Sequence, residues 1–352
     1  MKRRTILRGL PFTPFLNQSI ENNLNTQTVV NEDIMCPKNI KPKRLKLGDT
    51  LGLIAPSSAL SAETIAKAVS NLQNLGFKTK LGKNVAAING YLAGTDEQRL
   101  EDLHWAFSDK EIDAVWCVRG GYGAGRLLPK VDFNLIKKNP KIFIGYSDIT
   151  ALHVAIHQRT GLITFHGPVG TSEYSDFTKP HVWDILTNPT PQYLLPNATE
   201  NVNNPSNLFK IEVIAAGKCT GKLIGGNLSL LSAMSGTPFE LKNLKGKILF
   251  MEDIDERPYR VDRMLTQLLQ QVDLRQCAGI ALGIFEGCNP KPDETSLSLM
   301  DCFKDRLGNL GIPVVYGLSF GHIRNQFTIP VGIEATLDTE TATLTLLESG
   351  VL

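Results

Sequence analysis

The sequence lacks the signals that mark metal-binding, disulfide-rich and membrane-spanning proteins. Its six cysteines stand singly, with no CxxC pair, so we expect neither a zinc site nor a disulfide framework. No apolar run approaches the roughly 20 residues that cross a bilayer. A GxGxxG fingerprint and a loop ending in GK[ST] are both missing, which argues against the common nucleotide-binding loops.

An excess of charge of either sign is also missing. The 37 Lys and Arg residues nearly balance the 35 Asp and Glu residues, so a dedicated nucleic-acid binder is not expected. The chain does have 42% hydrophobic residues over a length of 352, which is enough to bury a sizeable core. Because this length exceeds most single cores, we expect two domains.

The amino-terminal segment is predicted to lie outside the folded part of the protein. Lys2–Arg8 is similar to a twin-arginine export pattern, but the apolar stretch Gly9–Leu16 that follows is short and contains two prolines. We favour a basic, disordered tail over residues 1–42, and hence a cytoplasmic protein. A degenerate export signal, with periplasmic export, is the alternative interpretation.

From residue 45 onward, apolar segments of strand length alternate with segments of helical period. Strands are predicted near 49–56, 113–118 and 141–146, and helices over 61–75 and after a capping Thr95. Such alternation indicates βαβ units and a parallel sheet.

A polar stretch at 171–205, rich in Pro, Asn and Thr, separates this pattern from a second one and is the natural connection between two domains. Beyond it the pattern contains more antiparallel strand. The predicted elements are strands at 247–252, 278–285 and 312–318, a helix at 259–272 and a hairpin within 327–347.

Ser147 is the sharpest candidate for chemistry. An apolar strand runs into Gly145, and a helix is predicted just after Ser147. A serine on such a tight turn is exposed, and the helix N-terminus favours a developing oxyanion. The usual elbow has glycine two residues after the serine, where Ile149 stands here. A helix N-cap, a common place for serine, is therefore the alternative.

The segment Arg119–Arg126 (RGGYGAGR) directly follows a predicted strand. Glycines let the backbone approach a ligand and turn amide hydrogens toward negative charge. The segment is therefore a candidate oxyanion loop at the carboxyl end of the sheet. A plain turn is the alternative.

A hydrolytic serine needs a base, and the base needs an orienting carboxylate. Among the six histidines, His166 and His322 both lie beside glycine at predicted strand ends, and the residues alone do not choose between them. His153 and His157, four apart on one helix, are interpreted as packing residues rather than metal ligands.

Glu252 is the leading candidate for the carboxylate. It ends an apolar strand, which is a costly place for a charge without a partner. Asp255 and Glu256 follow nearby and compete for the role, but a solvated loop explains them equally well.

In their order along the chain, these motifs resemble those of the LD-carboxypeptidase family, serine peptidases that include murein tetrapeptide carboxypeptidase and the microcin-immunity peptidases. The motifs are RGGYG at 119–123, GYSD at 145–148, GGNLS at 225–229, ED at 252–253 with PYRVDRML at 258–265, and FGH at 320–322. The resemblance covers about Pro42 to Thr345.

The resemblance implies a catalytic triad in which Ser147 is the nucleophile, His322 the base and Glu252 the orienting acid. The implied oxyanion hole consists of the backbone amides of Asp148 and of Gly120 or Gly121, so the Asp148 side chain itself is not needed. The implied reaction releases D-alanine from murein tetrapeptide by hydrolysing the bond between an L-centre and the terminal D-residue, without metal or organic cofactor. A basic group should hold the substrate carboxylate, but no motif identifies it.

For the fold, we expect the α/β class: an N-terminal flavodoxin-like or amidotransferase-like domain with a parallel sheet, and a smaller C-terminal α/β domain with antiparallel strands. The expected boundaries are 1–42 for the extension, 43–170 for the nucleophile domain, 171–215 for the linker and 216–348 for the domain carrying Glu252 and His322.

We expect a homodimer that acts on a small peptide in peptidoglycan recycling, with no nucleic-acid or membrane partner. The alternatives are a peptidase that cleaves microcin-like peptide–nucleotide antibiotics and a non-catalytic protein that binds an anionic ligand.

Overall fold

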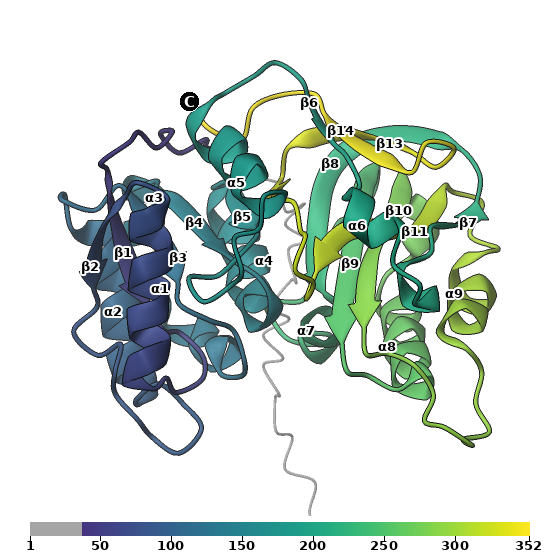
Figure 1. The fold of residues 1–352 in the computed structure, drawn as a ribbon, viewed down its shortest axis with the longest axis horizontal. Helices are drawn as coiled ribbons and strands as arrows, with labels where there is room; N and C mark the ends of the chain where they lie inside the picture. Colours follow the sequence, from purple (N-terminus) through teal and green to yellow (C-terminus); the bar gives the residue numbers. More distant parts are fainter. Residues whose placement is uncertain (1–36) are drawn as a thin grey trace, which may run out of the picture. The chain divides into compact units, whose positions relative to one another are not determined.

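The computed structural model of the protein describes residues 37–352. Two β-sheets flanked by helices form the frame of this part of the chain (Figure 1), which confirms the α/β class. Most of the predicted tail, including the candidate export signal, lies outside the described residues. Of the helices within residues 37–352, none combines the length and the apolar character that a membrane crossing requires.

The first sheet has six strands in the order β12-β5-β4-β3-β1-β2. These strands are β1 (Thr50–Ile54), β2 (Lys78–Leu81), β3 (Ala114–Cys117), β4 (Ile142–Gly145), β5 (Thr164–His166) and β12 (Ile329–Val331). Every pairing is parallel except that of β12 with β5. β3 and β4 are buried at every position, as expected for parallel strands that are covered on both faces.

Helices connect the parallel strands of this sheet, as the alternating pattern predicts. They are α1 (Ala62–Asn74), α2 (Asp96–Ser108), α3 (Phe133–Lys138) and α4 (Thr150–Thr160), and α5 (Thr178–Thr187) follows β5 on the way to the second sheet. Thr95 begins α2 with a capping box, because its hydroxyl accepts from the Gln98 N–H while the Gln98 side chain accepts from the Thr95 N–H.

The second sheet has eight strands in the order β6-β14-β13-β8-β9-β10-β11-β7. These strands are β6 (Tyr193–Leu195), β7 (Glu212–Ala215), β8 (Lys218–Asn227), β9 (Lys247–Ile254), β10 (Gly279–Glu286), β11 (Val314–Gly321), β13 (Glu334–Asp338) and β14 (Thr343–Leu346). The four central strands run parallel and the outer ones antiparallel. The hairpin predicted near the end is β13–β14. The helices of this part are α6 (Thr199–Val202), α7 (Leu228–Ala233), α8 (Pro258–Gln271) and α9 (Leu299–Leu307).

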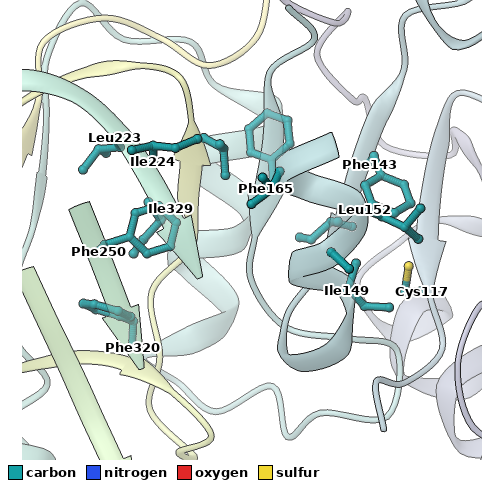
Figure 2. Packing of buried hydrophobic residues seen from close by; sticks show 14 of the residues in the cluster. Cys117, Phe143, Ile149, Leu152, Phe165, Leu223, Ile224, Phe250, Phe320 and Ile329 are labelled. Carbon is teal, nitrogen blue, oxygen red and sulfur yellow. The ribbon is translucent and has the colours of Figure 1, made fainter. Parts of the chain in front are cut away.

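Three short strands cross the predicted boundaries. β6 and β7 lie within the predicted linker and pair with β14 and β11 of the second sheet, whereas β12 lies within the predicted second domain and pairs with β5 of the first. Figure 2 shows Ile329 of β12 close to Phe250 of β9, and both belong to the same buried apolar cluster as Phe165 of β5. The two sheets therefore share one core, and the domain boundaries stay a prediction.

Candidate functional site

Ser147 occupies the strand-to-helix turn that the sequence predicts. It follows the end of β4 and begins a 3₁₀ turn, Ser147–Ile149, which leads directly into α4. Its φ of 66° lies in the left-handed region, where a residue other than glycine is strained. Neither the turn nor α4 begins with a side-chain capping bond, so the N-cap interpretation of Ser147 is wrong.

The glycine loop after β3 packs directly against Ser147. A Cβ atom at Gly120 would lie 2.8 Å from the Ser147 Cβ and 3.1 Å from its Oγ, so only glycine allows this approach. Gly121 has a φ of 114°, and a Cβ there would collide with the Ser58 hydroxyl. Within residues 37–352, the N–H groups of Gly120 and Gly121 make no hydrogen bond, which leaves them available to a ligand.

The Asp148 side chain has a role that sequence reasoning missed. Its buried carboxylate accepts hydrogen bonds from the Ser57 hydroxyl at 2.6 Å and from the Ala124 N–H at 2.7 Å. Burial raises the pKa of Asp148, and these hydrogen bonds oppose the rise. Because Ala124 lies in the glycine loop, the Asp148 carboxylate ties that loop to the turn that carries Ser147. The Asp148 side chain thus makes structural contacts in addition to the role expected of its backbone amide.

Arg99, on α2, ties the same loop from another direction. Its side chain is only 1% exposed, and Nη1 donates to the carbonyl oxygens of Gly123, at 2.9 Å, and of Pro56. An ion pair with Asp96 provides the opposite charge that a buried guanidinium needs. The glycine loop is thus held by side chains at two consecutive residues, Gly123 and Ala124.

Glu252 and His322 form a buried pair at the ends of β9 and β11. The Nδ1 atom of His322 lies 2.6 Å from Oε2 of Glu252, which is fully buried, while the His322 side chain is 12% exposed. Burial alone would lower the pKa of His322, but the Glu252 carboxylate and, less strongly, Asp253 and Asp255 outweigh it and raise the pKa. Burial alone would raise the pKa of Glu252, but His322 holds it below its usual value.

The GGNLS motif connects this pair to the helix that follows Ser147. Asn227 donates from its side chain to Asp253 at 3.0 Å, and its backbone N–H donates to the Thr150 hydroxyl on α4 at 2.9 Å. Asp253 also accepts from the N–H and hydroxyl of Ser229, both at 2.8 Å. Burial and the neighbouring Glu252 charge raise the pKa of Asp253 to about 6.

Tyr146 is where the two sides of the site meet. The centroid of its ring lies 4.8 Å from the centroid of the His322 ring, and the two rings pack edge to face. Tyr146 also directly precedes Ser147 in the chain. The structure therefore brings Ser147, Glu252 and His322 to the carboxyl ends of β4, β9 and β11 at one place. In the described residues no hydrogen bond joins Ser147 to His322, and such contacts often tighten only when substrate binds.

Of the other histidines on these elements, His166 and His153 are buried in the core and His157 is half-buried. His166 packs against Phe250 and Phe320, neither of its ring nitrogens has a partner among the described residues, and burial lowers its pKa to about 4. His153 and His157 are bonded to backbone carbonyls on the inner side of α4, as expected for packing residues. No group of three or more metal-type ligands gathers within residues 37–352.

An apolar groove of about 640 Å³ lies apart from these residues. It runs along α1, and its lining includes Leu60, Ile65, Val69, Val85 and Ile88. None of the predicted site residues contributes to it, so the groove is not the site that the motifs indicate.

Comparison with known proteins adds independent observations. The family described as LD-carboxypeptidase N-terminal domain matches residues 51–167, and the LD-carboxypeptidase C-terminal domain matches residues 220–337. A probable murein peptide carboxypeptidase of Bacillus subtilis (strain 168) is 43% identical over 318 residues, which cover 89% of this chain and 96% of that protein. The murein tetrapeptide carboxypeptidase of Pseudomonas aeruginosa is 37% identical over 305 residues, or 82% and 92% of the two chains.

Relatives with another named role are also similar. The microcin C7 self-immunity protein MccF of Escherichia coli is 30% identical over 332 residues, which cover 86% of this chain and 94% of that protein. Among solved structures, the MccF-like protein from Bacillus anthracis str. Ames matches with a TM-score of 0.77 and 31% identity over 88% of this chain and 99% of that one.

Proposed function

Because the chain belongs to the LD-carboxypeptidase family, we propose that it is a serine carboxypeptidase that removes the terminal D-alanine from murein tetrapeptide. The observation that carries the proposal is the buried Glu252–His322 pair, with 2.6 Å between Oε2 and Nδ1. A carboxylate bound to one ring nitrogen of a histidine fixes the tautomer that leaves the other nitrogen free to accept a proton.

In the proposed mechanism, Nε2 of His322 takes the hydroxyl proton of Ser147 as Oγ attacks the scissile carbonyl carbon. Glu252 holds the ring in place and stabilises the imidazolium that forms. The proton then passes from His322 to the amine of the leaving D-alanine. Water, activated by the same histidine, hydrolyses the acyl-enzyme and restores Ser147.

The negative charge of the tetrahedral intermediate develops beside the glycine loop. We assign its hydrogen-bond donors as the N–H of Asp148 and that of Gly120 or Gly121. The ties from the Asp148 carboxylate and from Arg99 hold these amides in place before the substrate binds. Preorganised donors of this kind are a large term in acyl-transfer catalysis, about 10²–10³-fold for each donor.

Incubation of the purified protein with murein tetrapeptide tests the proposal. Mass spectrometry should record the loss of one alanine with the native protein and no loss with Ser147→Ala. The proposal fails if the native protein leaves the peptide intact or if the variant cleaves it equally well.

A peptide–nucleotide antibiotic is the second candidate substrate, and the likeness to MccF favours it. The same assay distinguishes the two by offering an aminoacyl nucleotide of the microcin type beside the tetrapeptide. If the protein cleaves only the nucleotide compound, and this cleavage again depends on Ser147, the protein is a peptidase for peptide–nucleotide antibiotics.

We also propose a cytoplasmic homodimer that acts in peptidoglycan recycling without nucleic-acid or membrane partners. Its two domains would be 43–170 and 216–348, with 171–215 as the linker. The balance of charge along the chain supports a small substrate that is bound locally. Sedimentation, and sequencing of the mature amino terminus after cell fractionation, test the dimer and the compartment.

A further inference from the structure

A carboxypeptidase must recognise a free terminal carboxylate. A cationic side chain that lies near the nucleophile and has no partner in the protein could bind this carboxylate. Most arginines around the site are already engaged. Arg99 and Arg126 pair with Asp96, Arg260 pairs with Glu256, Arg324 pairs with Glu173, and Arg257 donates to the carbonyl of Asn289. Arg119 is exposed and, within residues 37–352, makes neither a hydrogen bond nor an ion pair.

The position of Arg119 in the chain places it next to the reacting atoms. It comes two residues after the end of β3 and directly before Gly120, the residue that packs on Ser147. Burial raises the pKa of Tyr146, and the nearby charge of Arg119 acts in the opposite direction. The Arg119 side chain therefore starts one residue from the glycine that packs on Ser147, and its charge acts on the tyrosine that directly precedes this serine.

The hydroxyl of Ser172 lies on the same side of the site. The chain after β5 crosses the end of β3, where the N–H and hydroxyl of Thr171 both donate to the carbonyl of Val118. This crossing brings the Ser172 side chain to the Tyr146 hydroxyl; burial raises the pKa of Tyr146, and hydrogen bonding to Ser172 opposes the rise. The Ser172 Oγ atom is shielded from solvent, and apart from this contact it has no hydrogen-bond partner within residues 37–352.

We propose that Arg119 binds the terminal carboxylate of the substrate peptide, with the Ser172 hydroxyl as a second donor, and thereby sets the preference for a free C-terminus. A guanidinium presents two parallel N–H groups that match a carboxylate. In the substrate, only the amide nitrogen and one carbon separate the terminal carboxylate from the scissile carbonyl. The substrate must place its scissile carbonyl at the oxyanion donors and its terminal carboxylate at a cation at the same time. Arg119, one residue from the proposed donor Gly120, is in a suitable position for this carboxylate.

The inference rests on the proposed function, and kinetics on a matched pair of peptides test it. The pair is murein tetrapeptide and the same peptide ending in D-alaninamide. Native protein should prefer the free acid. Arg119→Gln should lower kcat/KM for the acid by about 10–100-fold, mainly through a higher KM, and leave the value for the amide unchanged. Arg119→Lys keeps the charge without the fork and should recover part of the loss.

Arg324→Gln is the matched control, because Arg324 is exposed and close to His322 in the chain but already paired with Glu173. It should keep the native preference. An Arg119→Gln variant that still prefers the acid as the native protein does, or that loses activity equally on both peptides, overturns the inference. Failure of the native protein to cleave the tetrapeptide overturns the proposed function instead. Thermal unfolding should be the same for all three variants, since neither arginine is buried.

Discussion

The two sides of the site are held in place by opposite means. On the side of the first sheet, Ser147 is positioned by backbone: a strained φ of 66° and a glycine whose missing side chain lets the loop touch the serine. On the side of the second sheet, Glu252 and His322 are positioned by charge, because each compensates the other in a place that excludes water.

This difference predicts different weaknesses. The serine side depends on space, so it should be damaged by added atoms and be nearly indifferent to pH. The base side depends on charge, so it should be damaged by neutralising a group of unchanged shape, and its activity should follow the protonation of His322. Substitutions that change only volume or only charge therefore test the comparison.

Glu252→Gln removes the charge of the base side and keeps its shape, and it has the largest expected effect. Without the carboxylate, His322 loses the partner that fixes its tautomer and stabilises its charged form. We expect kcat to fall by about 10⁴-fold, as happens when the orienting acid of a triad is replaced by its amide. Steady-state kinetics on murein tetrapeptide measure this. A loss below about 10-fold would remove Glu252 from the proposed triad.

The pH profile of the same variant provides its control. His322 must be neutral to accept a proton, and its pKa is raised above the ordinary 6.5, so native kcat/KM should fall as the pH drops through a value above 6.5. In Glu252→Gln the lowering effect of burial is no longer outweighed, and the acid limb should move to lower pH. An acid limb that stays in place would contradict the assignment of His322 as the base.

Gly120→Ala adds one carbon to the serine side. The new Cβ would lie 2.8 Å from the Ser147 Cβ, so the loop and its free N–H groups must move away. We expect kcat to fall by about 10²–10³-fold, the cost of losing one oxyanion donor, without a shift of the acid limb. Gly125→Ala is the matched control, because a Cβ at that position of the same loop meets nothing within 4 Å. Equal activity of the two variants would disprove the steric argument.

Asp148→Ala tests the buried carboxylate on the serine side. Both the Ser57 hydroxyl and the Ala124 N–H donate to its Oδ2 atom, so removing the side chain leaves two buried donors without an acceptor and the loop should loosen. We expect a loss of about 1–3 kcal/mol in the free energy of unfolding and about a 10-fold fall in kcat. Urea unfolding and kinetics measure the two effects. Ser57→Ala, which removes one donor only, should lie between Asp148→Ala and the native protein; a Ser57→Ala variant worse than Asp148→Ala would refute the proposed tie.

Much of this comparison could be predicted from the sequence, but not the contacts that make it work. The alternating strands and helices, the hairpin β13–β14 and the positions of Ser147, Glu252 and His322 are carried by local patterns and ordered motifs. The tie between Asp148 and Ser57 joins residues 91 apart in the chain, and no local pattern encodes it.

The short strands show the same limit. β6 and β12 have three residues each, too few for a period to be recognised. Their pairing is decided by which sheet edge they reach, and so depends on the folded structure. The glycines at 120, 121 and 123 indicate that the backbone of this loop lies close to another group. They do not indicate that this group is Ser147.

His166→Leu changes a residue that lies between the two sides of the site. It has the smallest expected effect, which is on the pH dependence of the free energy of unfolding. The imidazole of His166 is buried against Phe250 and Phe320, and its pKa is lowered to about 4 from an ordinary 6.5. Between these two values the unfolded chain binds a proton that the folded protein does not, so the free energy of unfolding falls as the pH is lowered from about 6.5. This residue contributes at most about 1.4 kcal/mol per pH unit to that slope. Urea unfolding of native protein and variant at several pH values from 7.5 to 5 should give a shallower dependence for His166→Leu, whereas two parallel curves would mean that His166 is protonated in the folded protein.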